Sequence, residues 1–499
     1  MQHRPDAFVA NAKEALADAN LGLALARLRG ALGGMRGAAV GRLPEFEALR
    51  DAGRDIRAHT LKHLDAYLEL FEAKVLAQGG VVHWARDAAE ARAAVLGICA
   101  RHDATKVTKG KSMVSEEIAL NDALAAAGIR SVETDLGEYI VQLRGDRPSH
   151  IIAPAIHVLK EQVRELFDDR HAQENLAPVP FSTTAAQAGV GQAQVGDEVT
   201  ALVREARAVL RKRFLEADVG ITGANFCVAE TGSTVIVTNE GNGDLTQSLP
   251  RVHIVLVGIE KMVPTLEDLS TLVRLLARSA TGQEISVYTT LSTGPKRAGD
   301  PDGPDEFHVV LLDNGRSEML GGEFEDMLRC IRCAACLNAC PVYGAVGGHT
   351  YGSVYPGPMG SVLTPALHLH EGHGIAHSAH LPNASTFCGR CEQVCPVRIP
   401  LPSLLRGWRQ REWQAGLGAP AVRAGLGLWR YAATRPVLYR LLARAVAFLL
   451  GRLARGRGRI DRLVLGGAWT AWHDLPAPEG ESFTARWRRE RAARGDRAG

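Results

Sequence analysis

The sequence predicts an α/β protein that carries a cysteine-rich module and has helical regions at both ends. Three observations support this fold class. Short β-branched runs alternate with amphipathic helical segments between residues 80 and 312, which is typical of a layered α/β domain. Seven of the nine cysteines fall between residues 330 and 395. Segments rich in good helix formers lie before and after these two regions.

Length and composition exclude several classes of protein. The chain has 499 residues, of which 46% are hydrophobic and 23% charged, as in globular proteins with a sizeable core. No stretch approaches the roughly 20 uncharged apolar residues of a membrane span. The first residues include Asp6 and Lys13 and lack the apolar run of a secretory signal. We therefore expect a cytoplasmic protein, in which disulfides are rare.

The pattern predicts four parts. Residues 1–65 form a helical region that serves packing, and a further helix ends at Gly79 and Gly80. Residues 66–312 form the α/β domain. Residues 313–405 form the cysteine-rich module, and residues 406–499 a basic helical region.

Strands and helices alternate within the α/β domain. Helices are expected over 87–102 and 116–128, and a Gly- and Gln-rich surface loop over 186–198. The strand-like segments are 81–85, 106–113, 131–135, 150–156, 228–241, 251–260 and 308–315.

The first cysteine motif, CIRCAACLNACP, contains Cys330, Cys333, Cys336 and Cys340 and ends at Pro341. This C-x2-C-x2-C-x3-C-P spacing is typical of two-cluster ferredoxins, in which the fourth cysteine ligates the other cluster. Zinc sites more often pair two separate Cys knuckles. The motif therefore predicts iron–sulfur clusters, and because residues 313–405 show little periodicity, we expect the module to depend on them more than on an apolar core.

The second motif, CGRCEQVCP, contains Cys388, Cys391 and Cys395, with Ser385 at the position of a first cysteine. Crossed ligation assigns Cys330, Cys333, Cys336 and Cys395 to cluster one. Cys340, Cys388 and Cys391 remain for cluster two, one thiolate short of four. A [3Fe–4S] centre, a non-Cys fourth ligand and an open iron stay as alternatives; we favour [4Fe–4S] with an unusual fourth position.

Other candidate ligands have simpler interpretations. We interpret the histidine-rich segment between the motifs as a solvated polar loop, with metal binding as the alternative; it contains His368, His370, His373, His377 and His380. Cys99 and Cys227 are expected to be buried structural thiols, with Cys227 as a less favoured missing ligand.

Polar residues gather after several predicted strands, in 109–117, 222–233 and 238–242. Such loops suit an anion or small ligand at the carboxyl ends of parallel strands, but the pattern alone favours tight turns.

Nine segments closely resemble the lactate-utilisation iron–sulfur protein B family, from about residue 20 to 485. They are KSMVSEEIALN, VETDLGEYIVQL, PSHIIAPAIH, ITGANFCVAETGSTVIVTNEGN, GIEKMVPT, RSATGQ, CIRCAACLNACPVYGAVGGHTYGSVYPGPMGSVLTP, FCGRCEQVCPVRIPL and LPAPEGESF. The family's cluster ligands correspond to the seven cysteines of the two motifs. Ala334 departs from the glycine that is common there, and Cys227 stands where another residue is expected.

The resemblance implies a lactate-utilisation (LUD) domain, similar to the ribose-isomerase and CoA-transferase class, joined to a two-cluster ferredoxin-type module. It implies the electron-carrying subunit of a non-flavin complex that oxidises L-lactate, beside a cysteine-rich subunit and a small LUD-domain subunit. The alternatives are an electron carrier for a glycolate or glycerol-phosphate type dehydrogenase, and a redox-sensing ligand-binding protein. The catalytic residues stay unassigned, and we expect no nucleic-acid partner.

The basic tail differs from the rest of the chain. From residue 401 onward it holds 19 Arg, no Lys and seven acids, a net charge of +12, whereas the first 400 residues carry −9. An anionic contact is expected for such a segment, either an acidic partner subunit or the inner face of the membrane. An ordinary helical domain with solvated arginines is the alternative.

Overall fold

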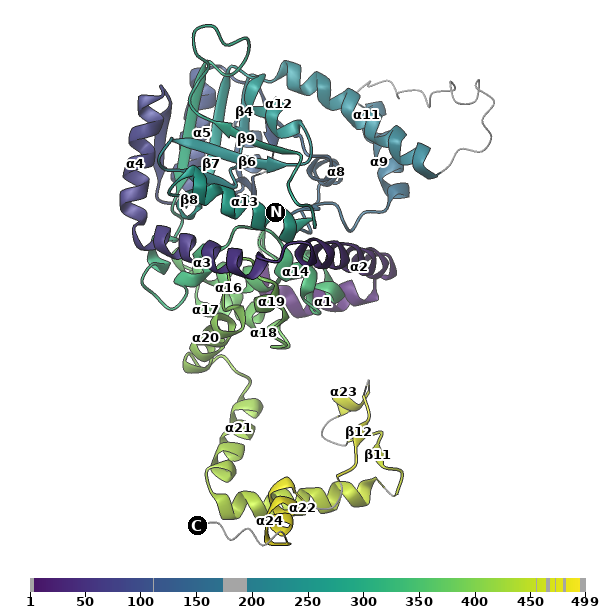
Figure 1. The fold of residues 1–499 in the computed structure, drawn as a ribbon. Helices are drawn as coiled ribbons and strands as arrows, with labels where there is room; N and C mark the ends of the chain where they lie inside the picture. Colours follow the sequence, from purple (N-terminus) through teal and green to yellow (C-terminus); the bar gives the residue numbers. More distant parts are fainter. Residues whose placement is uncertain are drawn as a thin grey trace. The chain divides into compact units, whose positions relative to one another are not determined.

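The computed structural model describes residues 4–110, 112–173, 195–454, 456–463, 467–471, 473–478 and 482–493. The chain divides into two compact units, Met1–Ala415 and Gly416–Gly499, which are described separately (Figure 1). Residues 186–194 of the predicted Gly- and Gln-rich loop lie outside the described residues, and helix α11 (Val195–Glu216) begins immediately after them.

A parallel sheet forms the centre of the first unit and confirms the predicted α/β class. Within the described part of the chain it has six strands, in the order β1-β10-β7-β4-β2-β3. All neighbouring strands run parallel. The strands are β1 (Val81–Ala85), β2 (Lys106–Gly110), β3 (Arg130–Glu133), β4 (Val219–Thr222), β7 (Val252–Gly258) and β10 (Glu306–Leu312).

Helices cover both faces of this sheet, which explains why β7 is buried along its whole length. Its side chains alternate between two apolar cores, as the two-residue period of a strand requires. Ile254 packs with α5 (Ala88–Arg101), and Val255 packs with α4 (Leu64–Ala77). Gly79, at φ +84°, follows α4, so the predicted helix stop is confirmed.

A second, smaller sheet in the described residues has the order β8-β5-β6-β9. Its strands are β5 (Phe226–Val228), β6 (Ser233–Thr238), β8 (Met262–Val263) and β9 (Tyr288–Ser292). Together with α13 (Leu266–Ala280) it contributes Phe226, Val235 and Leu272 to a core that continues into the cysteine module.

One predicted strand is wrong. Residues 150–156 form turns rather than a strand. The main-chain N–H of Ser149 donates to the carbonyl of Pro154 at 2.9 Å, and His150 forms a 2.9 Å hydrogen bond with Asn338 of the cysteine module. These bonds close the segment on itself and fix it to the module in place of a sheet.

The amino-terminal helices lie against the cysteine module (Figure 1). The predicted helical region over residues 1–65 divides into several helices. The first division is at Asp18, whose carboxylate accepts hydrogen bonds from the main-chain N–H groups of Asn20 and Leu21 and caps the second helix. The helices are α1 (Phe8–Ala17), α2 (Ala19–Gly41) and α3 (Phe46–Lys62).

The cysteine module contributes to a substantial apolar core that it shares with the α/β domain, which the low periodicity of residues 313–405 did not indicate. Trp408 is 1% exposed, stacks on Phe324 with ring centroids 4.1 Å apart and donates a hydrogen bond to the carbonyl of Val362 at 2.9 Å. The main helices are α14 (Ala335–Ala339), α15 (Tyr343–Val346), α16 (Gly357–His370), α17 (Ile375–Ser378), α18 (His380–Asn383), α19 (Arg390–Val394) and α20 (Leu401–Gln414).

The second unit contains amphipathic helices whose apolar side chains are exposed, among them Leu428, Trp429 and Leu449 at 63–73%. No helix in the described residues is long and apolar enough to cross a membrane. The elements are α21 (Pro420–Ala433), α22 (Pro436–Leu453), the antiparallel pair β11 (Arg459–Ile460) and β12 (Leu475–Pro476), α23 (Gly467–Thr470) and α24 (Phe483–Ala493).

Candidate functional site

The structure brings Cys330, Cys333, Cys336 and Cys395 to one small apolar cavity. Cys395 follows α19, so the second motif contributes one thiol to the group formed by the first motif. Burial raises the pKa of Cys395 to about 11, and burial together with the neighbouring cysteines raises that of Cys336 further. Thiolates at this place therefore need a compensating cation, and four converging sulfurs shielded from water suit an iron–sulfur cluster.

Cys340, Cys388 and Cys391 interact with one another as a second group. Cys388 is exposed, whereas the other two are buried. No further cysteine of the described residues joins them, because Cys99 of α5 and Cys227 of β5 lie in two other apolar cores. The ligand assignment of both groups stays a prediction.

The loop of the first motif has an unusual backbone. Arg332 and Ala334 have φ values of +58° and +60°. Glycine adopts this left-handed conformation without steric cost, which accounts for the glycine that is common in place of Ala334. These two left-handed residues turn the chain between the cysteines of the motif, and α14 begins directly after them.

Arginines of the amino-terminal helices hold the second motif in place. Arg50, 6% exposed, donates to the carbonyl oxygen of Cys395 at 2.8 and 3.0 Å and to that of Gln393 at 2.9 Å. Arg36 donates to the carbonyl oxygen of Val394 at 2.9 Å. Sequence reasoning assigned this region to packing alone; the available signal was basic residues among the apolar positions of its helices.

A buried charge network joins the α/β domain to the first motif. The Glu260 carboxylate accepts a hydrogen bond from Arg316 at 2.7 Å and lies 3.4 Å from the Arg332 guanidinium. Burial alone would raise the pKa of Glu260, but the charges of Arg316, Lys261 and Arg332 together outweigh burial and lower it to about 2. Arg316 also binds Glu117, at 2.7 Å, and Arg57 donates to the main-chain oxygens of Glu260 and Met262.

A pocket of about 460 Å³ lies where the parallel strands end, and we name it the strand-end pocket. Lys261 and Arg332 line it together with Tyr355 of the cysteine module. Ser112, Gly223, Asn225, Thr238 and Asn239, which belong to the polar segments singled out in the sequence, also line it. Lys109 does not, because it is buried in ion pairs with Glu116 and Glu133 at 2.7 Å each.

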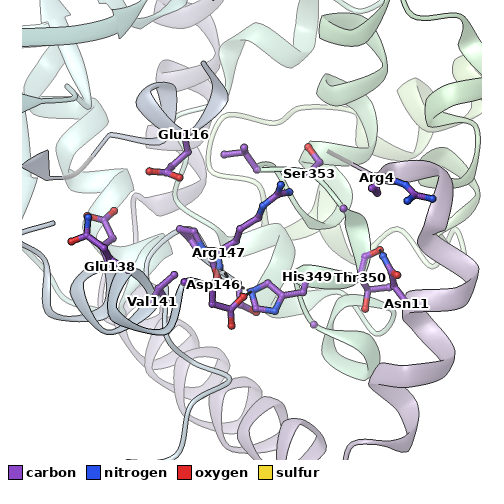
Figure 2. Close-up of a pocket in the computed structure, with 18 of the residues that line it drawn as sticks. Arg4, Asn11, Glu116, Glu138, Val141, Asp146, Arg147, His349, Thr350 and Ser353 are labelled. Carbon is purple, nitrogen blue, oxygen red and sulfur yellow. Dashed lines mark hydrogen bonds and ion pairs between the residues drawn. The ribbon is translucent and has the colours of Figure 1, made fainter. Parts of the chain in front are cut away.

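A larger cavity of about 780 Å³ has a mainly acidic lining and suits cations better than anions (Figure 2). The acids are Glu14, Asp18, Glu116, Asp122, Glu133, Glu138 and Asp146, against Arg4 and Arg147. At one side Asp146 lies 2.9 Å from His157 and 3.7 Å from His349. These three side chains could hold a metal ion. Although burial opposes it, the hydrogen bond from His157 keeps the pKa of Asp146 well below its usual range.

The histidine-rich segment is partly helical rather than a loop, because α16 continues to His370. His368 is 6% exposed and shares a hydrogen bond with Ser378 at 2.7 Å. His373 stacks on His377, and His370 pairs with Glu318 at 2.8 Å. In the described residues these contacts stabilise the turn after α16.

Comparison with known proteins also divides the first unit into an α/β domain and a cysteine-rich domain. Residues 68–312 match the LUD domain, and residues 326–399 match the 4Fe-4S dicluster domain. A lactate utilization protein B of Bacillus pumilus is 44% identical over 89% of both chains, and that of Shouchella clausii 45% identical over 89% of both. The uncharacterized electron transport protein YkgF of Escherichia coli is 41% identical over 91% of this chain and 90% of its own.

The fold and the two cysteine groups define an iron–sulfur protein in which a LUD domain is joined to a 4Fe-4S dicluster domain. At the level of sequence, the chain belongs to the lactate utilization protein B family.

Replacing Cys395 by serine should damage the cluster held by Cys330, Cys333 and Cys336, because Cys395 lines their cavity. EPR of the reduced, anaerobically purified full chain should then lose one signal and keep the other. Cys99→Ser is the matched control and should keep both signals. Loss of the signal that Cys388→Ser also removes, with the other intact, would refute crossed ligation.

Proposed function

We propose that this chain is the iron–sulfur electron-transfer subunit of a complex that oxidises L-lactate to pyruvate without flavin. The observation that carries the proposal is a dicluster module packed through one continuous core onto the LUD domain. Relatives covering 89% of the chain are named lactate utilization protein B, which supports lactate as the substrate.

Oxidation of lactate to pyruvate releases two electrons and two protons. Iron–sulfur clusters, when bound, accept and pass on single electrons. The protein's own part is to exclude water and fix the charges around them: the first cysteine group lies in an apolar cavity, and Arg50 fixes the main chain at Cys395.

We propose two partners, a cysteine-rich electron-transfer subunit and a small LUD-domain subunit. The second unit is suited to binding them, because α21 and α22 expose both arginines and large apolar side chains. Arginine favours bidentate contact with carboxylates, which suits an acidic protein surface. Contact with the inner face of the membrane is the alternative.

A glycolate or glycerol-phosphate donor is the second candidate for the substrate. The strand-end pocket, at about 460 Å³, has room for either donor as well as for lactate. Growth of a deletion strain on each carbon source separates these donors.

Lactate should reduce the clusters of this chain only when the two partner subunits are present. The measurement is the anaerobic visible and EPR spectrum of the co-purified complex after addition of L-lactate, with D-lactate, glycolate and glycerol phosphate as comparisons. We expect reduction with L-lactate and stoichiometric pyruvate. Equal reduction by glycolate or glycerol phosphate, or none by L-lactate in the complete complex, would contradict the proposal.

The second unit should bind the partners in a salt-dependent manner. A chain ending at Ala415 should recover less of the partner subunits than the full chain at low salt, and the difference should shrink at about 1 M salt, where the Debye length is ~3 Å. The measurement is a pull-down with both lengths, and co-sedimentation with anionic vesicles tests the alternative. Equal recovery by both lengths under all conditions would leave this unit without a docking role.

A further inference from the structure

Lys261 is a buried cation that forms no direct ion pair within the described residues, although the neighbouring charge of Glu260 attracts it. It is 6% exposed and lines the strand-end pocket. Among the described residues, no hydrogen bond or ion pair to its ammonium group is found within normal distance. Burial and the charge of Arg332 lower the pKa of Lys261 to about 8. An ammonium group that lines a pocket without a direct ion pair is available to an anionic ligand there.

Buried cations outnumber buried carboxylates around Lys261. Four cations, Arg57, Lys261, Arg316 and Arg332, surround two carboxylates, Glu117 and Glu260. Both carboxylates are bound by Arg316.

The cations other than Arg316 make different contacts. Arg57 donates to main-chain oxygens. Arg332 keeps one contact of 3.4 Å with Glu260 and packs on the ring of Tyr355 at 4.6 Å. Lys261 and Arg332 therefore offer positive charge to the pocket beyond what the two carboxylates balance.

The other residues that line the strand-end pocket limit the kind of anion that it can bind. The acidic residues Asp135, Glu138, Glu240 and Glu260 also line the pocket, and Asp135 caps helix α8 (Leu136–Arg144). They repel a polyanion such as a nucleotide, whereas a single charge can reach the two cations. Apolar side chains of Val114, Ile140 and Leu276 contribute to the walls and suit a short carbon chain.

We propose that the strand-end pocket binds a small 2-hydroxy or 2-oxo carboxylate, with Lys261 and Arg332 as the partners of its carboxylate. The choice of acid rests on the proposed function; the anion site itself rests on the buried charges. Arg332 stands between Cys330 and Cys333 in the sequence, so the ligand binds beside the first cysteine group.

A competing explanation is that Lys261 and Arg332 only balance the negative charge of a cluster. Cys330 does interact electrostatically with both side chains. In that case the pocket takes no anion, and Lys261 affects the cluster alone. Binding measured directly on the loaded protein distinguishes the two explanations.

The test is calorimetric titration of the cluster-loaded full chain with L-lactate and pyruvate, with inorganic phosphate as competitor. Wild type should bind both acids, and Lys261→Met should weaken binding at least about tenfold, as expected for loss of a charge-assisted hydrogen bond. Lys212→Gln, an exposed lysine of α11, is the control and should bind as wild type. Lys261→Met should melt no lower than wild type, since it removes an unpaired buried charge.

Ala224→Leu tests the site without changing charge, because Ala224 lines the pocket. Ala224→Leu should also weaken binding of both acids, because the larger side chain fills part of the pocket. It replaces Lys261→Met as the test if that variant loses iron. Absence of binding by the loaded wild type, or wild-type affinity in both variants, would overturn the site. Phosphate that competes as well as pyruvate would overturn the assignment to carboxylates. Reduction of the clusters by lactate in the complete complex tests the proposed function separately.

Discussion

The arrangement of the first unit depends on the buried carboxylate of Glu260, which follows the central strand β7. Arg316 binds it from the segment after β10, Arg332 approaches it from the first cysteine motif, and Arg57 of α3 binds its main-chain oxygen. Breaking such a pair leaves an uncompensated buried charge, at a cost of about 3–5 kcal/mol. The side chain and main chain of Glu260 thereby link the sheet, helix α3 and the cysteine loop.

This constraint explains how an electron-transfer module and a ligand-binding domain act together. The residues that end β7 and those that shape the first cysteine loop share the same ion pairs, so a change at the strand-end pocket is felt beside Cys330. Arg36 of α2 and Arg50 of α3 hold the second motif through hydrogen bonds to its main-chain oxygens. Both carboxylates of the network are bound by Arg316, whereas Lys261 and Arg332 leave excess positive charge at the pocket. Perturbed charges of this kind are characteristic of functional sites.

Local patterns in the sequence predicted the layered α/β domain and its strands well, because β7 and β10 are continuous apolar runs and Gly79 marks a helix end. Residues 150–156 were missed because their conformation is set by contacts with the distant Asn338. The core of the cysteine module was missed because Trp408 and Phe324 are 84 positions apart and show no common period. Lys261 was not singled out, since only the fold reveals that no carboxylate pairs with it.

The most direct test of this account is the reduction potential of each cluster in wild type and in Glu260→Gln, measured by EPR-monitored titration of the loaded full chain. Removing a buried negative charge beside the first motif favours the more negative, reduced form there. We expect the potential of the cluster held by the group of Cys330 to rise, while that of the group of Cys388 stays unchanged. Glu216→Gln, at an exposed ion pair with Lys106, should leave both potentials unaltered. Equal potentials in wild type and Glu260→Gln for both clusters would contradict the account.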